Sequence, residues 1–165
     1  SVTNATESGA QEETLTLTDA KAFGLTSSAF GNNGKIPAKY SCDGADVSPP
    51  LTISGVPDGT IKMVILMNDD NVAWDHWGLY NIPPTTTSIC TGCVPSGALQ
   101  GKNSFGDNGY GGPCPPSDHS YTFTLYALDK TPNLGAGASN SDVYDAIENN
   151  IIKKTTLVGC YPSCP

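Results

Sequence analysis

The stretch that decides the fold of this chain is Tyr121-Thr122-Phe123-Thr124-Leu125-Tyr126-Ala127-Leu128. Its first half alternates aromatic residues with threonine, which is the pattern of a strand with one buried face. Its second half is almost wholly apolar, as in a strand that is buried on both faces. Further strands are predicted at residues 51–53, 61–67, 76–82 and 155–158.

One helix is predicted near the end of the chain. Ser141 is expected to cap it, and Asp142 suits its positive N-terminal end. Its buried face is expected to carry three residues spaced four apart, which are Val143, Ile147 and Ile151. Lys153 and Lys154 are expected at its C-terminal end. The predicted order is a series of strands, then one helix, then a last strand. This order predicts an all-β sandwich with a peripheral C-terminal helix.

Length and composition fit one domain preceded by a tail. The chain has 165 residues, of which 38% are hydrophobic, and it contains 18 glycines and 13 prolines. Residues 1–20 hold acidic but no basic side chains and are predicted to form a flexible acidic tail, whereas residues 21–165 are expected to form a single domain. The long stretch 100–118 is rich in Gly, Asn and Pro, and a loop of that length is usually functional or disordered.

The charge of the chain excludes several classes of partner. Its 16 acidic residues outnumber 8 basic ones, all of them lysine, so the net charge is −8. No basic cluster is present, which argues against binding to nucleic acid or to an anionic membrane surface. No apolar run approaches the roughly 20 residues that cross a bilayer, so we do not expect an integral membrane protein.

Six cysteines occur, and four of them form two tight pairs. The pairs are Cys90 with Cys93 and Cys160 with Cys164, while Cys42 and Cys114 lie apart. This even, paired pattern favours disulfides and therefore a secreted, periplasmic or cell-surface protein. Six cysteines allow 15 pairings, so the spacing alone leaves the connectivity open.

Several segments of the chain resemble the phosphatidylethanolamine-binding protein family, in its bacterial and archaeal branch. They run in the family's own order from about Leu25 to Tyr161. The segments are Ile36-Pro37-Ala38-Lys39-Tyr40-Ser41-Cys42-Asp43-Gly44, Val47-Ser48-Pro49-Pro50-Leu51, His76-Trp77 with Leu79-Tyr80-Asn81-Ile82-Pro83, and Gly109-Tyr110-Gly111-Gly112-Pro113-Cys114-Pro115-Pro116. The resemblance implies a Greek-key β-sandwich of antiparallel sheets with a small pocket at one end, which binds phosphate-like and carboxylate-like anions, including phospholipid head groups.

The resemblance also implies which residues line that pocket. The predicted ligand-binding residues are Asp70, Trp74, His76, Gly112, Pro113, His119 and Tyr121. Asp69 is an alternative to Asp70, because the segment after the strand is shorter here than in the family. Gly112 and Pro113 match a loop whose backbone amides line the pocket. Ser120 stands where the family often has an arginine. Family segments that carry Cys42 and Cys114 approach the pocket end, so the resemblance implies a disulfide between them and leaves Cys90–Cys93 and Cys160–Cys164 as the local pairs.

The predicted function is the non-catalytic binding of a small anion, without a cofactor or a metal. A redox role for Cys90 and Cys93 is disfavoured because Val94-Pro95 follows the motif, where thioredoxin-like chemistry needs a helix. A metal hydrolase built on His76 and His119 is disfavoured because no metal-ligand spacing is present. The alternative function that the resemblance implies is a secreted inhibitor of serine proteases, or a modulator of another protein, acting through surface loops.

Overall fold

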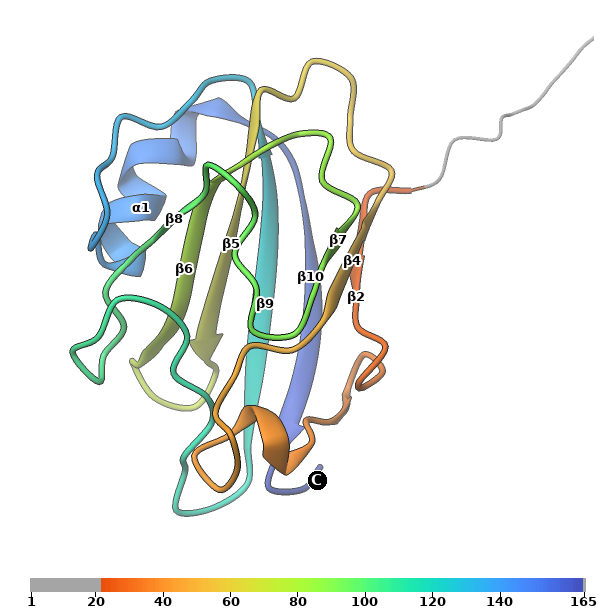
Figure 1. Cartoon of the computed structure of the whole chain (residues 1–165), viewed down its shortest axis with the longest axis vertical. Helices are drawn as coiled ribbons and strands as arrows, with labels where there is room; N and C mark the ends of the chain where they lie inside the picture. The colour runs from red at the N-terminus through yellow and green to blue at the C-terminus, as the bar shows by residue number, and fades with distance from the viewer. Residues whose placement is uncertain (1–21, 165) are drawn as a thin grey trace, which may run out of the picture.

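The strands form two sheets that face each other (Figure 1). The computed structural model describes residues 22–164, so the tail predicted at residues 1–20 lies outside the described residues. The large sheet has the strand order β3-β10-β9-β5-β6-β8 and the small sheet the order β2-β4-β7. The elements are β2 (Gly24–Thr26), β3 (Gly34–Lys35), η2 (Ala38–Tyr40), β4 (Leu51–Ser54), β5 (Lys62–Asp69), β6 (Asp75–Ile82), β7 (Ser88–Ile89), β8 (Leu99–Gln100), β9 (His119–Leu128), α1 (Asn140–Ile147), η3 (Glu148–Asn150) and β10 (Ile151–Tyr161). The predicted all-β sandwich with one helix near the C-terminus is confirmed.

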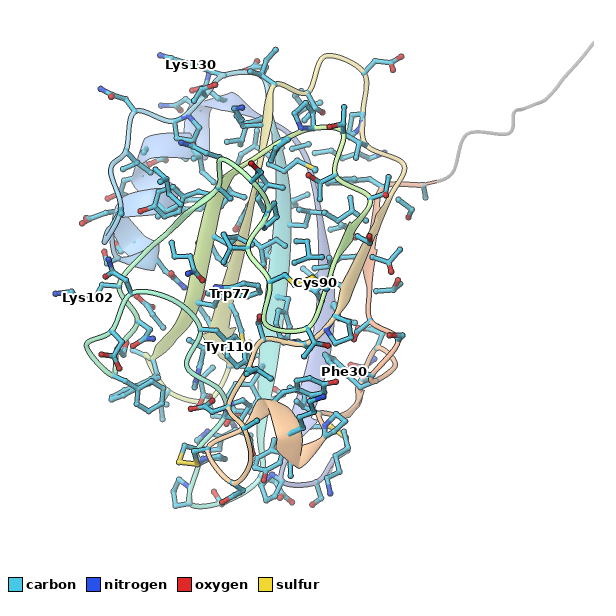
Figure 2. All side chains as sticks on the ribbon, in the orientation of Figure 1. Phe30, Trp77, Cys90, Lys102, Tyr110 and Lys130 are labelled. Carbon is cyan, nitrogen blue, oxygen red and sulfur yellow. A yellow bond between two sulfur atoms is a disulfide. The ribbon has the colours of Figure 1, made fainter. Side chains whose placement is uncertain are left out.

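The large sheet is the middle layer of the molecule, which explains the apolar run in β5. Met63, Ile65 and Met67 face the small sheet and belong to the larger core cluster. Val64 and Leu66 face the other way and pack in a second cluster with α1. Successive side chains of a strand point to opposite faces, so a strand covered on both sides must be apolar throughout. Figure 2 shows side chains filling the space between the layers, with Trp77 and Phe30 of the larger cluster labelled.

The long strand β9 lies between β5 and β10 and is antiparallel to both. One short pair departs from the predicted antiparallel pattern, because β3 runs parallel to β10, with Gly34 opposite Gly159. Most of the chain separates these two strands, so no tight turn imposes an antiparallel direction on them. The strand predicted at residues 155–158 is longer than expected and begins at Ile151.

The helix begins and ends earlier than predicted. Ser139, and not Ser141, is its N-cap, and the Ser139 hydroxyl accepts a hydrogen bond from the Asp142 amide at 3.1 Å. Val143 and Ile147 are buried as expected. Ile151, however, pairs with Leu128 of β9 as the first residue of β10, so sheet pairing overrides its helical spacing. Lys153 and Lys154 consequently lie in β10 and not at the helix end. No helix within residues 22–164 has the length and apolar character needed to span a membrane.

Candidate ligand-binding site

A cavity of about 370 Å³ opens at one end of the sandwich. It lies where β5 ends and where β6 and β9 begin, at the lower end of the large sheet in Figure 1. Its walls are Asp69, Val72, Trp74, His76, Phe105, Cys114, Pro115, Pro116, His119 and Tyr121. Four of the seven predicted binding residues therefore meet in one cavity, namely Trp74, His76, His119 and Tyr121.

His76 is held in the second position of β6 by the loop that faces it. Its Nδ1 lies 2.6 Å from the carbonyl oxygen of Gly111, and the Gly111 amide donates to the His76 carbonyl oxygen at 2.9 Å. A carbonyl oxygen only accepts, so Nδ1 carries the proton and donates it. Desolvation of this buried ring lowers the pKa of His76 below its usual 6.5, although the bond to Gly111 and the charge of Asp69 oppose that shift.

His119 is held by the carboxylate of Asp69. Its Nδ1 lies 2.6 Å from Asp69 Oδ2, and the side chains of His119 and Asp69 are 13% and 5% exposed. The other carboxylate oxygen of Asp69 accepts the Asn71 amide at 2.7 Å. Both carboxylate oxygens of Asp69 therefore accept hydrogen bonds. In His119, as in His76, Nδ1 is hydrogen-bonded to the protein and, within residues 22–164, Nε2 is not.

Asp70 does not line the cavity, and this corrects the assignment of the pocket aspartate. Residues 69 and 70 point to opposite faces because side chains alternate along the extended end of β5. Asp69 pairs with Tyr121 in the register of β5 and β9 and faces the cavity. Asp70 is exposed and accepts hydrogen bonds from the hydroxyls of Ser120 and Thr122, both at 2.9 Å to Oδ2.

Gly112 and Pro113 do not line the cavity either, contrary to the prediction. The Gly112 amide donates to Asp46 Oδ1 at 2.7 Å, so it is already engaged. Proline has no amide hydrogen, and the Pro113 carbonyl accepts the Cys42 amide at 3.1 Å. A Cβ on Gly112 would overlap the carbonyl oxygen of Tyr40, so packing against residues 40–46 requires this glycine. The loop contributes Cys114, Pro115 and Pro116 to the cavity instead.

Tyr121 contributes a polar group that lacks a protein partner. Its side chain is fully buried, and within residues 22–164 its hydroxyl makes no hydrogen bond. Burial raises the pKa of Tyr121 well above its usual value, so the hydroxyl keeps its proton and can donate it. The Tyr121 ring packs edge-on against His76, with ring centroids 5.1 Å apart.

The rim of the cavity is apolar and exposed. Trp74 and Phe105 are 38% and 46% exposed, and their rings meet edge to face at 5.3 Å. Val72 adds a third exposed apolar side chain. Sequence reasoning missed Phe105 and Val72. The available signal for Phe105 was an aromatic residue within the Gly- and Asn-rich loop 100–118, where large apolar side chains are rare.

The cysteines pair as predicted. Cys42–Cys114 joins two segments separated by 72 residues and brings Cys114 to the cavity wall. Cys90–Cys93 and Cys160–Cys164 close short local loops.

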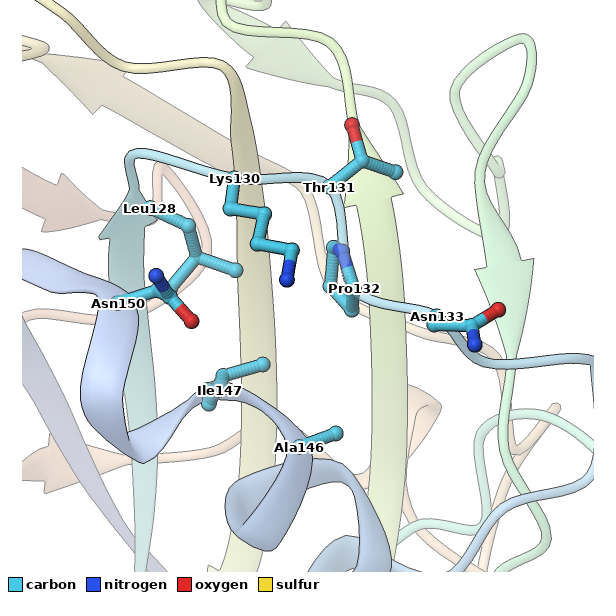
Figure 3. Close-up of a pocket in the computed structure, with 8 residues that line it drawn as sticks. All are labelled: Leu128, Lys130, Thr131, Pro132, Asn133, Ala146, Ile147 and Asn150. Atoms are coloured by element: carbon cyan, nitrogen blue, oxygen red, sulfur yellow. The ribbon is translucent and has the colours of Figure 1, made fainter.

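A second cavity, of about 210 Å³, lies between α1 and the segment that follows β9 (Figure 3). Leu128 and Ile147 are the buried apolar residues in its wall, and Lys130 reaches over it. None of the predicted binding residues lines this cavity.

The model of the phosphatidylethanolamine-binding protein family matches residues 26–162, which is nearly the whole of the described chain. The chain belongs to the phosphatidylethanolamine-binding protein family. Relatives of this family member include a UPF0098 protein of Methanothermobacter thermautotrophicus, which is 44% identical over 83% of this chain and 97% of its own length. The UPF0098 protein PH1269 of Pyrococcus horikoshii is also 44% identical, over 82% of this chain and 74% of its own.

Two crystal structures of family members resemble the fold. CT736, a phosphatidylethanolamine-binding protein homologue of Chlamydia trachomatis, superposes with a TM-score of 0.81 at 36% identity and covers 86% of this chain and 98% of its own. YbcL of E. coli, a member of the mammalian phosphatidylethanolamine-binding protein family, superposes with a TM-score of 0.80 at 30% identity and covers 84% and 97% of the two chains. The folds of these two family members therefore agree with the β-sandwich described above.

Proposed function

We propose that the protein binds a small phosphate-like or carboxylate-like anion, without catalysis, in the cavity between His76, His119 and Tyr121. The observation that carries this proposal is the buried Tyr121 hydroxyl, which has no partner among residues 22–164. An unsatisfied buried polar group costs roughly 1–3 kcal/mol. A ligand oxygen that accepts a hydrogen bond from this hydroxyl removes that cost.

The two imidazole rings supply the remaining polar atoms. Each ring has Nδ1 occupied, by Gly111 in one case and by Asp69 in the other, so Nε2 is the atom left for a ligand. An anion can accept a hydrogen bond from such an Nε2 only when the ring carries a second proton. The chain has no arginine, no lysine among residues 22–164 lines the cavity, and Asp69 adds negative charge, so a proton taken up by His76 supplies the positive charge.

The exposed apolar rim favours an anion that is attached to an apolar group, as in a phospholipid head group with its acyl chains. Trp74, Phe105 and Val72 provide that surface. Inorganic phosphate and a short-chain phosphatidylethanolamine share the phosphate, and only the second has carbon atoms to place on this rim. We expect the lipid analogue to bind more tightly than phosphate, by an amount that grows with the apolar area buried.

Substitution of Tyr121 tests the proposal. Calorimetric titration of sulfate, which does not change its charge near neutral pH, is expected to show about tenfold weaker binding to Tyr121→Phe, since one hydrogen bond to a charged group contributes about 1.5 kcal/mol. Tyr126→Phe is the matched control, because Tyr126 lies on the same strand but packs in the cluster beneath α1. Equal sulfate affinity of Tyr121→Phe and the unmodified protein would refute the proposed site.

Two further assignments complete the proposal. The three disulfides suit an oxidising compartment, so we place the protein outside the cytosol, in a secreted, periplasmic or cell-surface location.

We also propose that the protein is not an enzyme, and esterase or phosphatase turnover that disappears in His76→Ala would overturn this. Inhibition of serine proteases through surface loops stays a prediction.

A further inference from the structure

The peptide group between Gly111 and Gly112 is held at both of its ends. Its carbonyl oxygen accepts the Nδ1 hydrogen of His76 at 2.6 Å, and its N–H donates to Asp46 Oδ1 at 2.7 Å. The C=O and N–H of one trans peptide lie in one plane and point in opposite directions. Whatever orients the N–H therefore also orients the carbonyl that His76 meets.

Asp46 is itself fixed in place on the side away from His76. Its amide donates to the carbonyl oxygen of Lys39 at 2.9 Å, and its φ of 57° is a conformation that few side chains adopt. The neighbouring Cys42 is bonded to Cys114 and donates its amide to Pro113. The segment that carries Asp46 is thus attached to the loop that carries Gly112 at several points.

The peptide has a second orientation available to it once the Asp46 contact is lost. Glycine on both sides permits a rotation of the peptide plane that residues with a Cβ resist. The rotated peptide would direct its N–H toward His76 Nδ1, which would then have to accept. The proton of a neutral ring would move to Nε2, and Nε2 would become a donor without any uptake of a proton.

We infer that Asp46 is a positioning residue that selects the Nδ1–H tautomer of His76 through the Gly111–Gly112 peptide. The inference rests on the proposed anion site for its functional consequence. With this tautomer, neutral His76 can only accept at Nε2, so it donates to an anion only after it is protonated. Asp46 thereby makes anion binding depend on pH.

Other groups near His76 also influence whether its ring is protonated. Asp69 lies in the same cavity and, like Asp46, its charge favours the protonated ring. The Tyr121 ring packs against the His76 ring, with centroids 5.1 Å apart, and the centroid of the His119 ring lies 6.4 Å from that of Tyr121. A test must therefore separate the charge of Asp46 from its hydrogen bond.

Two substitutions of Asp46 make that separation. Asp46→Asn removes the charge and keeps an oxygen that accepts the Gly112 amide, and Asp46→Gly removes both and tolerates the positive φ. Side-chain ¹⁵N NMR spectra at about pH 8, without ligand, report which ring nitrogen is protonated. We expect the Nδ1–H form of His76 in the unmodified protein and in Asp46→Asn, and a shift toward the Nε2–H form in Asp46→Gly. At that pH, Asp46→Gly should bind sulfate roughly threefold to tenfold more tightly than Asp46→Asn.

The outcomes distinguish this inference from the proposed function. A folded Asp46→Gly protein that keeps the Nδ1–H tautomer overturns the role of Asp46, whatever sulfate does. A tautomer shift in a series of proteins that never bind sulfate supports the role of Asp46 and overturns the anion site. An Nε2–H tautomer of His76 in the unmodified protein would contradict the inference directly, even if Asp46→Gly fails to fold.

Discussion

His76 and His119 differ in the group that accepts a hydrogen bond from Nδ1. A neutral carbonyl of Gly111 holds His76, whereas the carboxylate of Asp69 holds His119. Both rings donate from Nδ1, so each needs a second proton before Nε2 can donate to an anion. His76 binds this second proton less readily than a histidine in water does, because burial lowers the pKa of its ring.

Sulfate affinity is therefore expected to rise as the pH falls from about 8 to about 6. In the free protein the pKa of His76 lies below 6.5, and a bound anion raises it by stabilising the imidazolium. Binding then takes up protons, so lower pH strengthens it. Calorimetry of sulfate at both pH values, with sulfate chosen because phosphate itself titrates near ~6, measures the effect.

The double variant His76→Ala with His119→Ala supplies the control for this pH dependence. We expect it to lose sulfate binding at both pH values. Affinity that is detectable but equal at both pH values, or unchanged in the double variant, would show that these histidines do not form the anion site.

At the scale of elements, the end of β5 decides which acidic side chain reaches the cavity. Asp69 turns inward, where it accepts hydrogen bonds from His119 and from the Asn71 amide. Asp70 turns outward and contacts hydroxyls on the exposed face of β9. Two neighbouring residues of one type thus have separate roles, which the alternation of the strand assigns to them.

This assignment predicts unequal effects of two matched substitutions. Asp69→Ala leaves the partly buried His119 Nδ1 without its acceptor, and is expected to lower the free energy of unfolding by roughly 1–3 kcal/mol. Asp70→Ala should have a smaller effect, because water can replace the exposed bonds that it loses. Urea denaturation of both variants measures the difference. A larger loss in Asp70→Ala would contradict the orientation of this strand end.

At the scale of the whole molecule, one disulfide spans far more of the chain than the other two. Cys42–Cys114 closes a loop with a sequence separation of 72, compared with 3 and 4 for the local pairs. In the chain-entropy view, a cross-link stabilises by restricting the unfolded chain, and its effect grows with the logarithm of the loop length.

Replacement of both cysteines of the long loop by serine should accordingly destabilise the protein most. We expect Cys42→Ser with Cys114→Ser to lower the free energy of unfolding by about 4 kcal/mol, and Cys90→Ser with Cys93→Ser by about 2 kcal/mol. Urea denaturation of the two double variants provides the comparison. The entropic account would be wrong here if the local pair proved the more important.

The strand pattern could be predicted from the sequence because it depends on local periodicity. The disulfide connectivity and the roles of the two histidines followed from the resemblance to the family, since Cys42 and Cys114 are separated by 72 residues and their spacing alone does not pair them. The pattern of residues 121–128 predicted strand β9, and His76 and His119 lie at the starts of β6 and β9. The C-terminal end of the helix could not be predicted in this way. Ile151 has the spacing of a helical residue, but in the structure it pairs with Leu128 of β9.

The composition of the cavity was decided by the tertiary structure. Whether Asp69 or Asp70 faces inward depends on the register between β5 and β9, and a shift of one residue would exchange them. The engagement of the Gly112 amide depends on Asp46, which lies 66 positions earlier in the chain. By itself the sequence determined which residue types are available for an anion site. The packing of distant segments decided which of their polar atoms are already hydrogen-bonded and which are left for a ligand, because a buried donor or acceptor bonds to whatever the fold brings within reach.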